Sequence, residues 1–183
     1  MTTAGTTTDE AALERRLANV QLLLFDCDGV LTSGGVTWAN DAIEAKTFHI
    51  RDGLGIKLWQ RAGYHAGIVT GRSSHVVALR AEELGLTIVR QGVQDKQEAV
   101  AAILEETGLT WEQTAFIGDD LPDLACIMRC GIGVAVADAC AEVRAAARLV
   151  TALPGGAGAV REVVEKILQA RGHWQAIVSR YSA

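Results

Sequence analysis

The chain has 183 residues, of which 49% are hydrophobic, and a formal net charge of -5 at pH 7. That length and apolar content are sufficient for one domain with a single core. The negative balance leaves no general positive field to hold nucleic acid or an anionic membrane surface, so any anionic ligand needs a local basic pocket. We therefore expect neither a nucleic-acid partner nor a membrane partner.

The first segment, residues 1–19, predicts a Thr-rich polar tail through residue 8 and then a short helix over DEAALERRLANV. It has no basic region followed by an apolar run, and no apolar stretch of the chain reaches about 18 residues. The four cysteines form no CxxC pair and fit reduced thiols. Cys126 and Cys130, one helical turn apart, are interpreted as buried apolar residues, with metal binding as the alternative. These features predict a cytoplasmic protein.

Residues 20–170 form one predicted domain in which short apolar runs alternate with helical patterns. The predicted strands are VQLLLFD, HAGIVT, LTIV, TAFIGD, IGVAV and RLV. Helices are expected near residues 53–62, 74–85, 95–108, 121–130, 139–146 and 158–170. This repeated strand and helix order predicts an α/β fold, a Rossmann-like parallel sheet with helices on both faces. Residues 171–183 are expected to be a C-terminal tail.

Residues 30–50 depart from this alternation. Two runs that contain Thr or aromatic residues flank Asn40 and Asp41, a pair typical of a turn. The segment predicts a β-hairpin that projects after the first strand. No other stretch is long enough to form a second domain over the strand ends, so the domain is expected to be capless.

Polar side chains follow several of the predicted strands or open the helices after them. They are Asp26, Asp28, Thr70, Lys96, Asp119, Asp120 and Asp123. Each alone is compatible with a helix cap, but ligands of open parallel sheets bind at the carboxyl ends of the strands. Carboxylates from two strand ends would repel one another unless a cation lies between them. An all-oxygen site of this kind favours Mg²⁺.

The first acidic pair fits phosphoryl transfer. Asp26 ends a strand whose apolar residues fix its carboxylate at the sheet edge, where it can attack phosphorus. Asp28 lies on the same side of the extended chain, and Gly29 permits a sharp turn there. A sugar alkoxide is a poor leaving group, so Asp28 is the expected acid that protonates it and the base that later activates water.

The remaining polar groups fit the charge that such a reaction develops. Thr70, the Gly71 amide and Lys96 supply a hydroxyl, a backbone donor and a positive charge for the phosphoryl oxygens. Asp119 would complete the Mg²⁺ site with Asp26. Asp120 and Asp123 have secondary roles, and Asp123 is expected either to orient Lys96 or to cap a helix.

The motifs DCDGVLT, TGR, an isolated lysine and GDDLPD, in this order, resemble those of the haloacid dehalogenase superfamily of aspartate-nucleophile phosphatases. Within it, the hairpin, FHIRDGLGIK and GGAGAVRE resemble the family of 3-deoxy-D-manno-octulosonate 8-phosphate phosphatases. The resemblance implies a capless Rossmann-like domain, a magnesium ion and a role in lipopolysaccharide biosynthesis. It also implies a homotetramer whose hairpins assemble together and whose subunits complete each other's active sites.

The resemblance also implies roles for individual residues. Asp26 would be the nucleophile and Asp28 the acid and base, while Asp26, Asp119 and the backbone carbonyl of Asp28 would bind Mg²⁺. The implied substrate-binding residues are Asp28, His49, Ile50, Arg51, Asp52, Gly53, Lys57, Thr70, Gly71, Arg72, Arg80 and Lys96. His49 stands where the family pattern leads us to expect Asn, and Lys57 where it leads us to expect Arg.

A sugar acid phosphate carries two anionic ends, and the basic residues are sufficient for both. The cations expected at the carboxylate end are Arg51, Lys57, Arg72 and Arg80. Lys96 would hold the phosphate. Because Lys57 lacks the bidentate fork of Arg, the sequence supports the reaction more strongly than the identity of the sugar acid.

Three alternatives remain open at this point. A related nine-carbon sugar acid phosphate is the nearest one, although Arg72 after Thr-Gly favours the eight-carbon substrate. A phospho-acceptor signalling domain uses similar groups, but its acidic pair and acceptor Asp come in a different order along the chain. A non-enzymatic oligomerisation domain would not need all four motifs.

Overall fold

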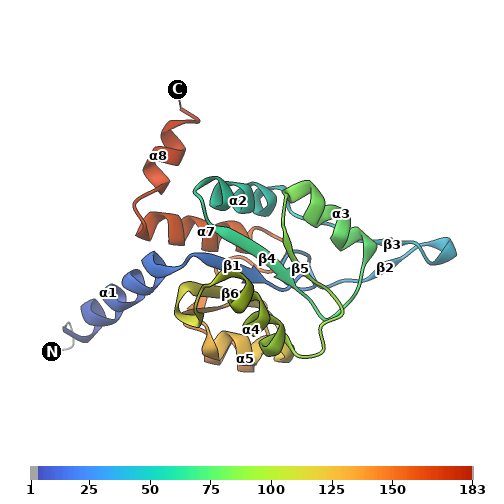
Figure 1. The fold of residues 1–183 in the computed structure, drawn as a ribbon, viewed down its shortest axis with the longest axis horizontal. Coiled ribbons are helices and arrows are strands. Elements are labelled where there is room, and N and C mark those ends of the chain that lie inside the picture. The colour runs from blue at the N-terminus through green and yellow to red at the C-terminus, as the bar shows by residue number, and fades with distance from the viewer. Residues whose placement is uncertain (1–3, 183) are drawn as a thin grey trace.

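The computed structural model describes residues 4–182 and shows a parallel sheet between two layers of helices (Figure 1). Helices α2 and α7 pack against each other on one face, and α4 and α5 pack together on the other. A two-stranded ribbon projects from the body at the right of the view. The α/β fold class predicted from the sequence, with the hairpin as a separate feature, is confirmed.

The structure contains eight strands and eight α-helices in the described part of the chain. The strands are β1 (Leu22–Phe25), β2 (Thr37–Trp38), β3 (Glu44–Ala45), β4 (His65–Val69), β5 (Ile88–Arg90), β6 (Thr114–Gly118), β7 (Ile132–Ala135) and β8 (Leu149–Val150). The helices are α1 (Ala4–Asn19), α2 (Ile50–Arg61), α3 (His75–Leu84), α4 (Lys96–Thr107), α5 (Leu124–Arg129), α6 (Ala141–Ala146), α7 (Ala159–Ala170) and α8 (Trp174–Ser179). Short 3₁₀ turns cover Asn40–Ala42, Trp111–Gln113 and Leu121–Asp123.

The main sheet has the strand order β5-β4-β1-β6-β7-β8, and every neighbouring pair is parallel. Strand β1 is central, with Phe25 opposite Ile68 of β4 on one side and Ile117 of β6 on the other. The three strands therefore end at nearly the same level. This register brings the residues that follow β1, β4 and β6 to one edge of the sheet.

The core lies on both faces of the central strands. All four residues of β1 and all five of β6 are buried, as expected for a parallel sheet covered on both sides. Helix α7 buries one apolar face in the core through Val160, Val163 and Ile167, and it packs against α2 and α1. The strand ends are thus built on a rigid layer, which positions the polar groups that follow them.

Both ends of the chain differ from the sequence-based expectation. Helix α1 begins at Ala4, so residues 4–8, expected as a tail, are helical, whereas residues 1–3 lie outside the described residues. In the segment expected as a C-terminal tail, residues 174–179 form α8. Both segments expected as tails therefore contain helices, and the predicted bounds of the domain, residues 20–170, stay a prediction.

The hairpin predicted over residues 30–50 is present, but its two strands are short. Thr37 and Trp38 pair with Ala45 and Glu44 in antiparallel order, and each strand has two residues. The turn contains Asp41 with φ of 63°, in the left-handed region that Asp and Asn tolerate better than most residues. None of the helices in residues 4–182 is both long enough and apolar enough to cross a membrane.

Candidate active site

The two acidic strand ends meet beside one another. The backbone amide of Asp26 donates to the carbonyl of Ile117 at 3.0 Å, which extends the pairing of β1 with β6 by one residue. Asp119 follows directly after β6. The sheet itself therefore places two carboxylates from distant parts of the sequence side by side.

Three carboxylates form an all-oxygen cluster at this edge. One carboxylate oxygen from each of Asp26, Asp119 and Asp123 lies within 4.8 Å of the others. The Oδ1 atom of Asp119 is buried and has no hydrogen-bond partner. Burial, followed by the charges of Asp123 and Asp26, raises the pKa of Asp119 to about 7. A buried, unpaired oxygen amid like charges is a fit site for a divalent cation such as Mg²⁺.

Lys96 supplies the positive charge next to this cluster. It is the first residue of α4 and only 4% exposed, and its Nζ lies 2.5 Å from Asp123 and 3.0 Å from Asp26. Burial alone would lower the pKa of Lys96, but the charges of Asp123 and Asp26 outweigh it and raise the pKa. Burial and the charge of Asp123 raise the pKa of Asp26, against the pull of Lys96. The ammonium is held beside the expected nucleophile.

Asp123 connects Lys96 to the loop that carries Asp119 and Asp120. One of its oxygens receives Lys96, and the other accepts hydrogen bonds from the amides of Asp119 at 3.0 Å and Asp120 at 3.4 Å. Asp123 is fully buried, whereas Asp120 is exposed. Both readings of Asp123 from the sequence describe its contacts, since it orients Lys96 and also caps the Leu121–Asp123 turn.

Close backbone approach explains two glycines at the site. Gly29 has φ of 89°, and a Cβ there would lie 2.0 Å from Oδ2 of Asp119. A Cβ at Gly155 would lie 1.8 Å from the carbonyl oxygen of Gly29. The loop after the acidic pair is therefore packed between Asp119 and the 155–156 loop, with no room for a side chain at either position.

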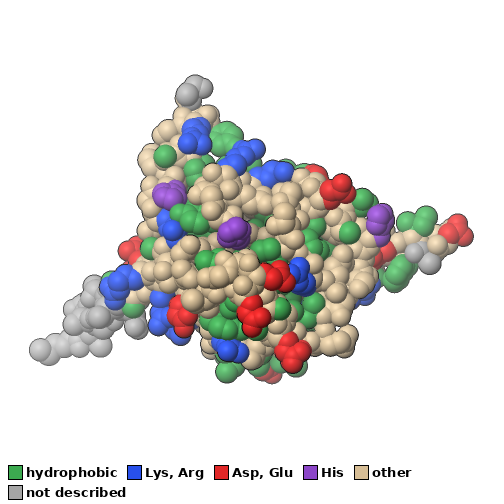
Figure 2. All heavy atoms as spheres, in the orientation of Figure 1, with side chains coloured by type: hydrophobic (Ala, Val, Ile, Leu, Met, Phe, Trp, Pro, Cys, Tyr) green, Lys and Arg blue, Asp and Glu red, His purple; other side chains and the backbone are tan. Residues whose placement is uncertain are grey.

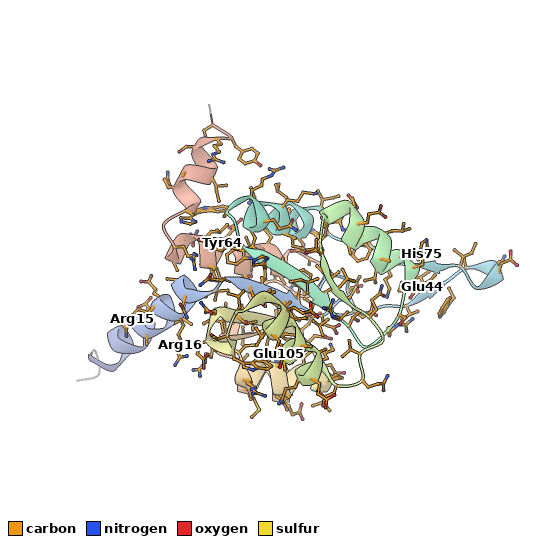
Figure 3. All side chains as sticks on the ribbon, in the orientation of Figure 1. Arg15, Arg16, Glu44, Tyr64, His75 and Glu105 are labelled. Atoms are coloured by element: carbon orange, nitrogen blue, oxygen red, sulfur yellow. The ribbon has the colours of Figure 1, made fainter. Side chains whose placement is uncertain are left out.

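Asp28 lies in a network of charges that the hairpin supplies. Lys46 contacts its Oδ1, and Arg72 Nε lies 3.5 Å from its Oδ2. Glu44 of β3 lies 3.1 Å from Arg72 and 3.4 Å from Lys46, and it accepts a hydrogen bond from the Ser74 hydroxyl. Figure 3 shows Glu44 on the hairpin beside the start of α3, where His75 is labelled.

Glu44, Lys46 and Ser74 were not among the residues predicted from the sequence. The signal was available in part, because Glu44 and Lys46 are opposite charges two residues apart and so lie on one face of an extended segment. What the sequence could not supply was the position of the hairpin relative to Asp28. The contacts depend on how the chain folds back between residues 28 and 46.

Thr70 and Gly71 lie where the strand-end argument placed them. Thr70 follows β4, next to the end of β1, and is 2% exposed. Its amide donates to the carbonyl of Arg90 and its carbonyl accepts from the amide of Val93, which fixes the loop on both sides. Gly71 is exposed, so its amide is at the surface of the same edge.

The residues before and within α2 are divided between surface and core. Ile50 is 79% exposed and Arg51 is also exposed, while Nδ1 of His49 is buried without a partner. Asp52 is 1% exposed, and its two oxygens accept from the amides of Gly158 and Arg161. Both oxygens of its carboxylate are therefore occupied by the first turn of α7, and the contact is structural.

The other expected substrate residues lie along α2 and α3. Arg80 pairs with Glu83 at 2.8 Å and lies over the ring of Phe48, and a Cβ at Gly53 would clash with its guanidinium at 2.4 Å. Lys57 donates to the carbonyl of Glu83 at 2.9 Å. Arg80 thus approaches the N-terminal part of α2, whereas Lys57 is turned to the C-terminal part of α3.

No cysteine belongs to a group of three or more candidate metal ligands in the described residues. Cys126 and Cys130 are buried, and burial raises the pKa of Cys126 to about 12. The only cluster of three or more candidate metal ligands in the described residues is the aspartate group around Asp26. The interpretation of the pair as buried apolar residues is the one that its surroundings fit.

Comparison with known proteins gives matches over most of the chain. A family model for haloacid dehalogenase-like hydrolases matches residues 74–161. The 3-deoxy-D-manno-octulosonate 8-phosphate phosphatase of Haemophilus influenzae is 39% identical over 160 residues, which cover 87% of this chain and 89% of that protein.

Solved structures resemble the fold as well. The same phosphatase from Moraxella catarrhalis, in complex with magnesium, phosphate and a KDO molecule, superposes with a TM-score of 0.91 at 36% identity, covering 92% of this chain and 97% of that one. The cobalt-bound phosphatase from Haemophilus influenzae gives a TM-score of 0.85 at 38% identity, covering 88% and 94%. The chain belongs to the haloacid dehalogenase superfamily and, within it, to the family of 3-deoxy-D-manno-octulosonate 8-phosphate phosphatases.

Proposed function

We propose that this phosphatase releases phosphate from 3-deoxy-D-manno-octulosonate 8-phosphate through a phospho-aspartate on Asp26. The observation that carries the proposal is the meeting of Asp26, Lys96 and Asp119 at the end of the two central strands. The names of the relatives support the substrate. A nucleophile, a buried cation and a cation site together are what transfer of a phosphoryl group to a carboxylate requires.

In the first step, an oxygen of Asp26 forms a bond to phosphorus as the bond from phosphorus to the sugar oxygen breaks. Asp28 donates a proton to the leaving oxygen, because an alkoxide leaves poorly. In the second step, Asp28 takes a proton from water, whose oxygen attacks the phosphorus and frees Asp26. Lys96, which lies beside Asp26, would balance the negative charge of the phosphoryl oxygens, and Thr70 and the Gly71 amide would donate hydrogen bonds to them.

A magnesium ion would be held by Asp26, Asp119 and the backbone carbonyl of Asp28. When bound, it neutralises charge on the phosphoryl group and the nucleophile. The unpaired Oδ1 of Asp119 supports this assignment, since a buried acceptor without a donor is costly unless a cation takes its place. Asp123 acts on the site through Lys96 and the Asp119 amide.

The carboxylate of the sugar acid would be bound by basic residues beyond the phosphate site. Arg72 is the best placed, because it is close to Asp28 and its side chain is 45% exposed. Arg51 is exposed and Arg80 lies at the side of α2, so both can contribute to a wider pocket. Ile50 and His49 would form its wall. Asp52 would act on the pocket indirectly, since its carboxylate binds the amides of Gly158 and Arg161 at the start of α7.

We further propose a homotetramer that assembles through the hairpins, while a cytoplasmic location remains a prediction. The hairpin exposes Val36, Trp38 and Ile43, with Trp38 and Ile43 each 61% exposed. Figure 2 shows hydrophobic side chains along this projection, which has little of its own core to cover them. Short exposed strands with apolar side chains favour pairing with another copy.

The test of the function is phosphate release by the wild type and Asp26→Asn, with Mg²⁺ and a panel of acidic and neutral sugar phosphates. The wild type should turn over many equivalents, and the eight-carbon acid phosphate should give the highest kcat/KM. A phospho-acceptor domain would instead stop after about one equivalent. The Asp26→Asn change should abolish turnover while the chain still folds, because an amide of the same shape is a poor nucleophile. Residual activity within about tenfold of wild type would remove Asp26 from its assigned role.

A further inference from the structure

The carboxyl group of Asp28 is contacted by two cations that differ sharply in burial. The ammonium of Lys46 contacts Oδ1, and the Lys46 side chain is 0% exposed. The Nε of Arg72 lies 3.5 Å from Oδ2, and its side chain is 45% exposed. One oxygen therefore has a buried partner at close range, and the other has a longer contact that faces solvent.

Lys46 is itself held in place from a second side. Glu44 lies 3.4 Å from its Nζ, and Glu44 is bound in turn by Ser74 at 2.5 Å, the residue that caps α3. Two cations and two carboxylates alternate in this network, so each charge in it has an opposite charge beside it. The lysine is fixed between the hairpin and the body of the domain, in contact with the loop that carries Asp28.

We propose that Lys46 is a positioning residue for Asp28, holding Oδ1 so that Oδ2 is the oxygen that exchanges a proton with the sugar oxygen and then with water. This inference rests on the proposed function, in which Asp28 is the acid and base. An acid that is held in one orientation reacts faster than one free to rotate, because the orientation is set before the reaction begins.

The same geometry explains how Oδ2 becomes available. Arg72 is the residue proposed to bind the sugar carboxylate, and a carboxylate of the substrate competes for its exposed guanidinium. When Arg72 turns to the substrate, Oδ2 loses its contact with Arg72. Lys46 has no such competitor because its side chain is closed off from solvent. Substrate binding thus leaves Asp28 with one oxygen held and one free.

The test compares Lys46→Met, whose unbranched side chain is one atom shorter and carries no charge, with Lys46→Arg, which keeps the charge. On the sugar acid phosphate, Lys46→Met should lower kcat by about 10- to 100-fold, less than the roughly 100- to 10,000-fold that a positioned acid contributes in full, and change KM by less than about threefold. The Lys46→Arg variant should retain most of the wild-type rate. Lys166→Met is the matched control, since Lys166 is a half-exposed residue of α7 paired with Glu162, and should leave the rates unchanged.

The leaving group and a double mutant make the test specific to Asp28. In single-turnover measurements, Lys46→Met should lower the rate on 4-nitrophenyl phosphate less than the rate on the sugar phosphate, because the nitrophenyl leaving group needs little protonation. The double variant Lys46→Met with Asp28→Asn should be no slower than Asp28→Asn alone. Equal losses on both substrates, a change confined to KM, or additive losses in the double variant would overturn the proposal.

Asp28→Asn also separates this proposal from the function on which it rests. If Asp28→Asn gives the leaving-group dependence and Lys46→Met does not, the role of Lys46 is wrong and the acid role of Asp28 stands. If Asp28→Asn lowers the rates of hydrolysis of both substrates alike, Asp28 is not the acid, and the proposal for Lys46 fails as well. Unfolding temperatures identify any variant that does not fold, and Lys46→Gln, which keeps a hydrogen-bond donor without the charge, then takes the place of Lys46→Met in the same comparison.

Discussion

The ammonium group of Lys96 lies 2.5 Å from the carboxylate of Asp123, whose other oxygen accepts the amide hydrogen of Asp119. One fully buried side chain thus joins the cation expected at the phosphate to the backbone of a residue expected at the metal. A change at Asp123 should therefore disturb both sides of the site, although Asp123 is not expected to touch substrate.

We predict that Asp123→Asn lowers kcat about 100-fold and raises the Mg²⁺ concentration needed for half-maximal activity. An amide of the same shape keeps one acceptor but sets an NH₂ group against either Lys96 or the Asp119 amide. The free energy of unfolding should fall by about 1–3 kcal/mol, the cost of a buried group that loses its partner. Activity over a Mg²⁺ titration and urea unfolding measure the two effects. Glu106→Gln, at a surface pair with Arg90, is the control, and an Asp123→Asn variant that matches it would contradict the prediction.

The raised pKa of Asp119 predicts how the stability of the metal-free protein depends on pH. Between its ordinary value of 3.8 and about 7, the folded chain keeps a proton on Asp119 that the unfolded chain has lost. The stabilising contribution of this proton is complete below about pH 4 and is lost as the pH rises through about 7. Because Mg²⁺ needs the carboxylate, the metal competes with the proton below pH 7.

The increase in unfolding temperature caused by Mg²⁺ should therefore be larger near pH 8 than near pH 5.5. Thermal unfolding at a fixed millimolar Mg²⁺ concentration, with and without metal at each pH, measures it. Asp119→Asn should remove both the pH dependence and most of the shift. An equal Mg²⁺ effect at the two pH values in the wild type would show that Asp119 does not control binding.

The sheet and the acidic cluster were predictable because local patterns determine them. Strand β1 ends just before Asp26 and β6 just before Asp119, and parallel strands that end together bring their next residues to one edge. Chain reversal over Asn40 and Asp41 was equally local. The predicted positions of these elements depend on periodicity and turn chemistry, which a single sequence contains.

The contacts of the predicted substrate residues were less predictable, because they depend on packing between distant segments. Asp52 looked like a binding residue, but its carboxylate is held by amides 106 and 109 residues away. Lys46 was not singled out from the sequence, yet its side chain is buried against Asp28. No pattern within either segment reports which residue of another segment will contact it.

Assembly through the hairpin can be tested by changing the hairpin, but its contacts with the active site limit which changes are informative. Deleting residues 33–46 should dissociate the proposed tetramer and lower activity together, but this deletion also removes Glu44 and Lys46, which contact the site of the same chain. Loss of activity in the deletion would not show that subunits complete one another. A variant that weakens only the exposed face is needed.

Trp38→Ser with Ile43→Ser is that variant, because both side chains are 61% exposed and Lys46 is retained. We expect light scattering to report smaller species at micromolar concentration, since the exposed apolar area that would be buried between copies is removed. Activity measured on the same samples then decides how the site is completed. Full activity in the dissociated chain would show that one subunit is sufficient. A tetramer that survives the double change would contradict assembly through the hairpin.

The last prediction concerns substrate choice and depends on the position of Arg72 between Glu44 and Asp28. Replacing Arg72 by Glu would place a third carboxylate against these two and would disturb Asp28 with every substrate. Arg72→Met removes the cation without adding an anion, and is therefore the sharper change.

An attraction between unit charges about 4 Å apart is roughly 4 kcal/mol at an effective dielectric near 20, before screening. Because Arg72 is 45% exposed, solvent reduces it, and we expect about 1–2 kcal/mol in practice. The kcat/KM of an acidic sugar phosphate should then fall about 5- to 30-fold in the Arg72→Met variant, and that of a neutral aldose phosphate by less than about threefold. The neutral substrate reports any damage to Asp26, Asp28 or the Mg²⁺ site, which would lower both rates alike. Parallel losses on the two substrates would leave a phosphatase whose preference for an acidic sugar lies outside Arg72.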